Sequence, residues 1–223
     1  MKFAVIVFPG SNCDHDAYYA LSKVLGVDVE FIWHKENSLK SIDAILIPGG
    51  FSYGDYLRTG AIAKFSPIMK EVVKSANKGL PVIGICNGFQ ILIEAGLLPG
   101  ALIRNINTKF ISKTISLDVI TEESMFTSKL KKNQIISMPI AHGEGNYQAS
   151  DDTLKELQDN DCIAFKYYQN KCENHNLNGS IQNIAGILNK QKNVLGMMPH
   201  PERACEKILG SKDGIGIFES MIN

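Results

Sequence analysis

The chain has 223 residues, of which 44% are hydrophobic, and its 23 basic and 23 acidic residues leave no net charge. This length is enough to bury a core, and we expect one domain spanning residues 1–223. A balanced charge lacks the basic surface that binds nucleic acids or anionic membranes. No apolar run reaches the roughly 20 residues that cross a bilayer. Composition therefore argues against nucleic-acid binding and against a membrane protein.

Short apolar strands alternate with helices in the first half of the chain. We predict strands over 3–8, 27–33, 44–47 and 82–85, and helices over 14–25, 65–77 and 88–95. Such an alternation is typical of a mostly parallel sheet that helices cover on both faces.

After Gly100, β segments predominate. We predict strands over 112–120, 135–140, 163–168, 184–188 and 194–198, a polar loop over 170–180 and a closing helix over 211–221. The second half of the chain therefore adds further β structure to the parallel sheet.

The cysteines are widely spaced and include no C-x-x-C pair, which argues against a disulfide framework and against a cysteine zinc site. We therefore expect reduced thiols in a cytoplasmic protein, mostly buried as small apolar residues. The cysteines are Cys13, Cys86, Cys162, Cys172 and Cys205.

One of these cysteines stands at the corner between a predicted strand and a predicted helix. Gly84 and Gly88 lie two residues before and after Cys86, as in the G-x-S-x-G elbow that holds a nucleophile on a tight, strained turn. The N-terminus of the following helix favours a thiolate, and it places the backbone N–H of Asn87 where an oxyanion could form. For this segment alone, a buried structural cysteine is the alternative.

A second motif follows the last predicted strand. Prolines on both sides of His200 fix the local backbone, and in an extended chain His200 and Glu202 would project to the same side. A histidine that removes the thiol proton of Cys86, oriented by a carboxylate, would complete a nucleophile–base–carboxylate triad. For this segment alone, a surface Pro-His-Pro turn is the alternative.

A glycine-rich turn, Pro48-Gly49-Gly50, follows the predicted strand over 44–47. Open α/β sheets place their sites at such carboxyl ends of strands. No Gly-Lys-Ser/Thr follows, which argues against a phosphate loop. We expect the backbone N–H of Gly50 or Phe51 to supply a second oxyanion donor, with a plain turn as the alternative.

Together these motifs resemble the class I (triad) glutamine amidotransferases, which share the cysteine elbow, the earlier Pro-Gly-Gly turn and the distal His-x-Glu. Within that family, motifs along essentially the whole chain resemble the glutaminase subunits of phosphoribosylformylglycinamidine synthase, an enzyme of purine biosynthesis. These motifs are Phe8–Asp14, Pro48–Asp55, Cys86–Gln90, Gly96–Gly100, Pro139–Gly145, Asn178–Ser180 and His200–Ala204. The resemblance implies a flavodoxin-like α/β fold.

The resemblance also implies the reaction. Glutamine would be hydrolysed to glutamate and ammonia through a thioester on Cys86, with His200 as the base and Glu202 orienting it. The backbone N–H groups of Gly50 and Asn87 would hold the oxyanion. The residues implied to bind the glutamine are Phe51, Ser52, Gln90 and Phe110.

Partners follow from the same resemblance. No phosphate-binding motif is left in the chain for ATP, so we expect the ammonia to be used elsewhere. The implied destination is a large synthetase subunit that uses ATP and Mg to convert formylglycinamide ribonucleotide to its amidine, joined through a small accessory subunit. The chain itself is expected to hold no cofactor and no metal. We expect it to be a weak glutaminase alone.

Two other functions compete with this one. Another cysteine hydrolase on the same scaffold would use the elbow, but such proteins often lack the distal His-x-Glu or a glutamine at the position of Gln90. A non-catalytic subunit of the same fold would have no chemical need for Cys86, His200 and Glu202 together.

Two features have no assigned role in this reaction. His142 and Glu144 lie two residues apart with no third ligand nearby, so a polar loop near the active site is favoured over a metal site. Cys13 follows the first predicted strand and has no base assigned to it.

Overall fold

One nine-stranded sheet organises the computed structural model, which describes residues 1–169 and 177–222. Five strands run parallel to one another. In spatial order they are β2 (Asp28–Trp33), β1 (Lys2–Val7), β3 (Ala44–Ile47), β4 (Val82–Ile85) and β11 (Val194–Met197).

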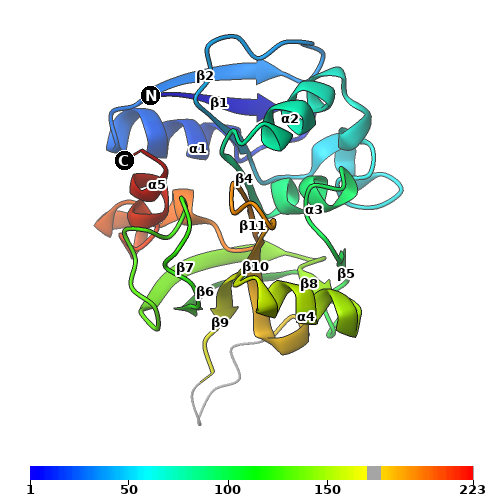
Figure 1. Cartoon of the computed structure of the whole chain (residues 1–223), viewed down its shortest axis with the longest axis vertical. Helices are drawn as coiled ribbons and strands as arrows, with labels where there is room; N and C mark the ends of the chain where they lie inside the picture. The colour runs from blue at the N-terminus through cyan, green and yellow to red at the C-terminus, as the bar shows by residue number, and fades with distance from the viewer. Residues whose placement is uncertain (170–176, 223) are drawn as a thin grey trace.

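Antiparallel strands continue the sheet beyond β11. They are β10 (Ile184–Leu188), β9 (Ile163–Tyr167), β6 (Ile111–Val119) and β7 (Ile135–His142). Figure 1 shows the parallel and antiparallel parts at opposite ends of the molecule. A separate small sheet pairs β5 (Ala101–Ile103) with β8 (Asn146–Gln148). The predicted α/β sheet with added β segments in the second half is confirmed.

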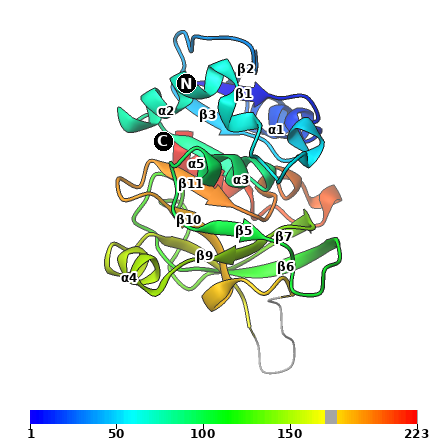
Figure 2. The same cartoon turned by 90° about the vertical axis from the view of Figure 1, so that its right-hand side faces the viewer.

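Helices lie on both faces of the parallel part. Figure 1 shows α1 (Asp14–Tyr19) and α5 (Ile215–Ile222) on one side, and α2 (Pro67–Asn77) and α3 (Asn87–Glu94) on the other. Figure 2, turned by 90°, shows the strands stacked from β2 down to β6. Because helices cover both faces, both rows of side chains on the central strands are buried. This burial explains why β3, β4 and β11 contain only apolar residues and glycine and are buried throughout.

Three predicted helices differ from those observed. The helix predicted over 14–25 ends at Tyr19 as an α-helix and continues as a π-helical turn over Ala20–Val24. The helix predicted over 65–77 begins at Pro67. The closing helix begins at Ile215, not at 211, because the preceding residues bond elsewhere: the Asp213 carboxylate accepts the N–H of Ser137 at 2.7 Å.

The helix α4 (Asp151–Asp159) is absent from the sequence-based prediction. Ser150 caps it by accepting the N–H of Thr153 at 3.3 Å. Only Leu154 and Leu157 of this helix are buried, a stripe too narrow to show as an apolar period. Of the polar loop predicted over 170–180, residues 170–176 lie outside the described residues. Within the described ranges, no helix combines the length and apolar character that crossing a membrane requires.

The topology brings the predicted functional segments to one edge of the sheet. The chain passes from β1 outward to β2 and then returns to the other side of β1 as β3. Ligands of open α/β sheets bind where the strand order reverses in this way, beyond the carboxyl ends of the strands. The loops that follow β1, β3, β4 and β11 all lie at that edge.

Candidate active site

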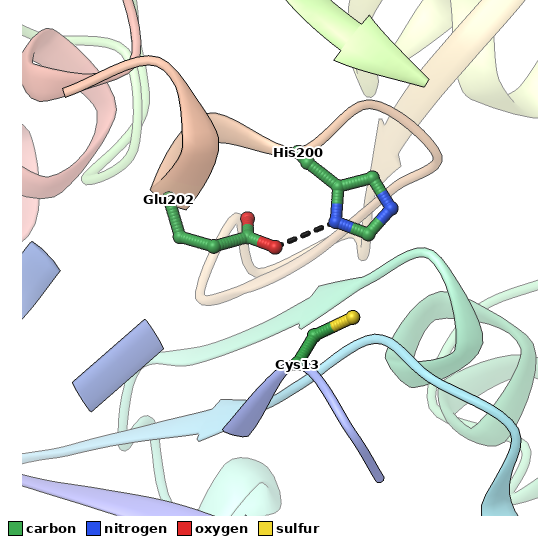
Figure 3. A group of neighbouring side chains, drawn as sticks. All are labelled: Cys13, His200 and Glu202. Carbon is green, nitrogen blue, oxygen red and sulfur yellow. Dashed lines mark hydrogen bonds and ion pairs between the residues drawn. The ribbon is translucent and has the colours of Figure 1, made fainter. Parts of the chain in front are cut away.

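Loops after four neighbouring parallel strands meet at this edge. They carry Cys13 after β1, Gly50 after β3, Cys86 after β4 and His200 after β11. The Cys13 sulfur, a ring nitrogen of His200 and a carboxylate oxygen of Glu202 lie within 4.8 Å of one another. Figure 3 shows these three side chains gathered from separate loops. Parallel pairing has therefore joined segments from opposite ends of the sequence into one site.

Cys86 occupies the strained turn that its flanking glycines predict. Its φ is 52° and its ψ is −106°, and α3 begins at the next residue. Such a conformation costs a non-glycine residue about 1–3 kcal/mol. A side chain at Gly84 would lie 2.6 Å from the carbonyl oxygen of Gly88, and one at Gly88 would collide with the carbonyl group of Ile47. The glycines are therefore required by the close approach of α3 to β3 and β4.

The histidine and the cysteine approach each other across Gly49. A methyl group on Gly49 would lie 2.8 Å from Cε1 of His200 and 3.4 Å from Cβ of Cys86. The Cys86 sulfur also lies 3.6 Å from the carbonyl oxygen of Ala141, near the end of β7. Only a residue without a side chain leaves room at position 49 for both groups.

His200 and Glu202 form a buried pair. His200 Nδ1 lies 2.6 Å from Glu202 Oε1, and each side chain is 1% exposed. The prediction that an extended chain aligns them is wrong: residues Pro201–Arg203 form a 3₁₀ turn. Because a carboxylate accepts, Nδ1 donates, which leaves Nε2 for the cysteine. Nε2 is buried and has no hydrogen-bond partner among the described residues.

The charges around His200 favour its protonated form. Burial lowers the pKa of His200, but the charges of Glu202 and Cys86 outweigh burial and raise this pKa to about 10. An imidazolium beside a thiolate is the activated form of a cysteine–histidine pair. The site is therefore arranged for nucleophilic attack by Cys86.

Cys13 lies beside the triad as a neutral thiol. Burial raises the pKa of Cys13 to about 12, although the charge of Arg203 opposes this shift. Arg203 Nη2 lies 3.0 Å from the Cys13 sulfur and Arg203 Nε donates to Asp16 at 3.0 Å. Cys13, His200 and Glu202 are close enough to share a metal ion, but the guanidinium beside Cys13 would repel a cation. We therefore interpret Cys13 as a thiol that supports the triad of Cys86, His200 and Glu202, and not as a metal ligand.

Two loops beside the elbow carry the backbone N–H groups expected to bind the oxyanion. Asn87 is the first residue of α3, so its N–H has no helical acceptor. In the loop after β3, the two possible donors are the N–H groups of Gly50 and Phe51. The N–H of Phe51 already donates to the carbonyl oxygen of Gly10 at 2.8 Å. Gly50 has a φ of 128°, a backbone conformation that glycine adopts readily and other residues rarely do. The geometry therefore favours Gly50 over Phe51 as the second donor.

A cavity of about 140 Å³ opens beside Cys86. Phe51 and Phe110 line it and remain 46% and 54% exposed, with ring centroids 6.4 Å apart. Ser52 is not among the lining residues of this cavity and is 3% exposed. The cavity is lined by Gly50, Phe51, Asp55, Thr59, Cys86, Gln90, Phe110, Ala141, His142, Gly143 and Glu144. Its volume suits a small substrate with one end at the sulfur.

Amide side chains hold one wall of this cavity in place. The Asn87 side chain accepts the N–H of Ser52 at 3.0 Å and donates to Gln90 Oε1 at 2.9 Å. Gln90 in turn donates to the carbonyl oxygen of Glu144 at 2.7 Å. Gln90 lines the cavity, and its bond to Glu144 ties α3 to the loop that follows β7. Ser52 contributes through its backbone, which fixes the loop after β3.

Several hydrogen bonds hold the segment 142–145 in place. Asn105 Oδ1 accepts from the N–H of Gly145 and pairs with His142 Nδ1, both at 3.1 Å. Asn178 and Ser180 both donate to the carbonyl oxygen of Gly145, at 2.8 and 3.1 Å. The conspicuous motifs 139–145 and 178–180 are therefore one structural unit. Asn105 had no sequence signal, because nothing in its neighbours predicts a long-range bond.

Comparisons with known proteins agree with this geometry. Residues 1–214 match the family of CobB/CobQ-like glutamine amidotransferase domains. The solved structure of PurLQS from Thermotoga maritima contains a chain that is 44% identical, with a TM-score of 0.90 and a match covering 100% of this chain and 97% of that chain.

More distant solved structures share the fold. The glutaminase domain of Trypanosoma brucei CTPS, with bound acivicin, is 12% identical, with a TM-score of 0.60 over 100% of this chain and 94% of that chain. A glutamine amidotransferase from Thermotoga maritima is 15% identical, with a TM-score of 0.57 over 91% of this chain and 76% of that chain. The family match spans nearly the whole chain and includes the elbow, the turn after β3 and the His-x-Glu segment, so this protein belongs to the CobB/CobQ-like glutamine amidotransferases.

Proposed function

We propose that the chain is the glutaminase subunit of phosphoribosylformylglycinamidine synthase. The observation that carries this proposal is the buried Cys86–His200–Glu202 arrangement beside a small cavity. The 44% identity to a chain of PurLQS over the full length supports the choice of this enzyme among glutamine amidotransferases.

In the proposed reaction, the Cys86 sulfur attacks the side-chain amide carbon of glutamine. A sulfur–carbon bond forms, and the charge that develops on the amide oxygen is held by the N–H groups of Gly50 and Asn87. The carbon–nitrogen bond then breaks, and the proton on His200 Nε2 goes to the leaving nitrogen, which departs as ammonia. Water, deprotonated by His200, hydrolyses the thioester to glutamate and restores Cys86.

Glu202 acts on this reaction through His200. Its carboxylate accepts the Nδ1 proton at 2.6 Å, which orients the ring and stabilises the imidazolium. Phe51 and Phe110, at the exposed mouth of the cavity, would cover the bound glutamine, and Gln90 would hold the wall against which it lies.

The ammonia is proposed to pass to a large synthetase subunit. That subunit would use ATP and Mg to convert formylglycinamide ribonucleotide to its amidine, and a small accessory subunit would join the two. The likeness to a chain of PurLQS supports this assembly. The free thiols of Cys13, Cys86, Cys162 and Cys205 fit a reducing compartment and support a place in the cytoplasm.

Partner dependence tests this proposal. Glutamate release by the chain alone should be slow, and adding the large and small subunits with ATP and formylglycinamide ribonucleotide should raise it about tenfold or more. The amidine product should form with glutamine as the nitrogen source. A fast glutaminase that the other subunits leave unchanged, with no amidine formed, would contradict the proposal.

A further inference from the structure

Two buried histidines of the site, His142 and His200, each have an Nε2 atom without a hydrogen-bond partner among the described residues. Buried polar atoms without a partner are rare in folded proteins. The reaction of Cys86 accounts for Nε2 of His200. No step of the proposed reaction uses His142, which is 3% exposed and lines the cavity that opens beside Cys86. His142 Nε2 therefore needs a partner that the folded chain does not supply.

The neighbours of His142 determine which of its ring nitrogens carries a proton. The Asn105 amide nitrogen donates to the carbonyl oxygens of Lys109 and His142, at 2.8 and 2.9 Å, so the amide oxygen of Asn105 is its acceptor. His142 Nδ1 lies 3.1 Å from that oxygen and must donate to it. In the neutral ring, Nε2 then carries a lone pair and can only accept.

The ring of His142 is held in one orientation and in one charge state. Asn105 bonds to one edge of the ring, and Gly145 lies so close to it that a methyl group on Gly145 would collide with Cε1 and Nδ1. Burial, and then the charge of His200, lower the pKa of His142 to about 4. His142 is therefore a fixed, neutral acceptor near pH 7 and does not compete with His200 as the base.

The carboxylates of the cavity already accept hydrogen bonds from within the chain. Asp55 accepts from Asn87 at 3.4 Å, and Glu144 accepts from Thr59 at 3.1 Å. Two further donors enter the cavity in the proposed reaction, namely the carboxamide of glutamine and the water that hydrolyses the thioester. The carboxamide nitrogen is positioned by its covalent bond to the substrate, whereas the water has no such bond. A reactant without a covalent bond to the substrate gains most from a group that holds it in place.

We propose that His142 Nε2 accepts a hydrogen bond from the water that hydrolyses the thioester on Cys86, and so holds that water for His200. One O–H of the water points to His142, and the other gives its proton to His200 Nε2. The water oxygen bonds to the thioester carbon, the carbon–sulfur bond breaks, and the sulfur leaves as the thiolate that pairs with protonated His200. Glutamate forms, and the second water proton goes to solvent. This inference rests on the proposed glutaminase function and adds a second histidine to its last step.

His142→Leu tests this role because it affects one half of the reaction and not the other. Leucine fills a similar volume without an acceptor, and Asn105 keeps the N–H of Gly145 as a partner, so the fold should be preserved. Attack by Cys86 does not use His142, so kcat/KM should stay within about threefold. Hydrolysis of the thioester should slow about 10- to 100-fold, as expected for loss of a hydrogen bond to a reacting group. As a result, kcat and KM should fall together.

The thioester itself reports the slowed step. The complete complex is mixed with glutamine and quenched in acid after short times, and intact mass spectrometry measures the fraction of the chain that carries a glutamyl group. This fraction should be higher in His142→Leu than in the unaltered chain. Hydroxylamine attacks a thioester without the help of a base that deprotonates water. Added hydroxylamine should therefore restore turnover of His142→Leu, with γ-glutamyl hydroxamate as the product.

Two further variants separate this role from a structural one. Met138→Leu alters the same buried row of β7, away from the cavity, and should hydrolyse the thioester at the unaltered rate. His142→Gln places an amide oxygen near the position of Nε2 and should recover most of the rate that leucine loses. The inference is overturned if His142→Leu loses kcat/KM and hydroxylamine does not restore its turnover. It is also overturned if His142→Gln or Met138→Leu hydrolyses the thioester as slowly as His142→Leu.

The unaltered chain distinguishes failure of this inference from failure of the proposed function. If the unaltered complex forms neither glutamate nor γ-glutamyl hydroxamate from glutamine, the glutaminase function itself fails, and this inference fails with it. If the unaltered complex forms both products but His142→Leu accumulates no thioester, the glutaminase function stands and only the role of His142 is overturned.

Discussion

Cys86→Ala should lower glutamine hydrolysis by about 10⁴-fold or more, the size of effect that follows loss of a nucleophile. The chain should still fold, because alanine keeps the Cβ and removes only a sulfur that makes one long contact, 3.6 Å to the carbonyl oxygen of Ala141. In the complete complex, synthesis from added ammonium should persist, since the proposed synthetase chemistry lies on another subunit. Coupled assays with glutamine and with ammonium, run side by side, measure both.

Cys162→Ala is the matched control for this variant. Cys162 is also buried, but its sulfur contacts the carbonyl oxygens of Asn160 and Asn189, far from the triad in the fold. It should keep full activity with both nitrogen sources. Retention of glutamine use by Cys86→Ala would show that another residue is the nucleophile.

Glu202→Gln should lower kcat for glutamine hydrolysis by about 10²- to 10⁴-fold with little change in KM, as loss of a triad carboxylate does elsewhere. The substitution removes the charge that stabilises the imidazolium of His200, and Glu202 does not line the cavity beside Cys86. Glu202 Oε2 is buried without a hydrogen-bond partner among the described residues, so the amide group replaces it in similar volume. Steady-state kinetics measure kcat and KM.

A second readout distinguishes this role from a structural one. Without the charge of Glu202, the pKa of His200 should fall, because that charge is what most raises it against burial. The positive charge beside the Cys86 sulfur is then reduced, and alkylation by iodoacetamide near neutral pH should slow. An unchanged kcat and an unchanged alkylation rate in Glu202→Gln would contradict the assignment of Glu202.

Much of the parallel sheet was predictable because its strands are short, apolar and buried on both faces. The predicted bounds of β3, β4 and β10 match the structure residue for residue. Helix α4 escaped prediction because it buries only two residues, and the strands β5 and β8 escaped because each has only three residues. The π-helical turn that follows α1 has residue types that also form α-helices, so its sequence does not predict the change of helix type.

The residues of the site also fall into two groups, those that the sequence could reveal and those that it could not. Cys86, His200 and Glu202 stand in motifs whose spacing reflects local backbone geometry, so the sequence reveals them. The parts that the sequence did not reveal depend on distant contacts. Asn105 holds the His142 ring although it lies 37 residues earlier in the chain. Asp55 becomes a cavity residue only once the turn after β3 has folded against α3 and the segment after β7.

The source of the transferred nitrogen tests the central claim most directly. The complete complex is supplied with glutamine labelled with ¹⁵N in its side-chain amide, together with unlabelled ammonium, and the amidine product is analysed by mass spectrometry. With the unaltered chain, the product should carry ¹⁵N, and with Cys86→Ala it should carry only unlabelled nitrogen. A ¹⁵N-labelled product from Cys86→Ala, or an unlabelled product from the unaltered chain, would contradict the account.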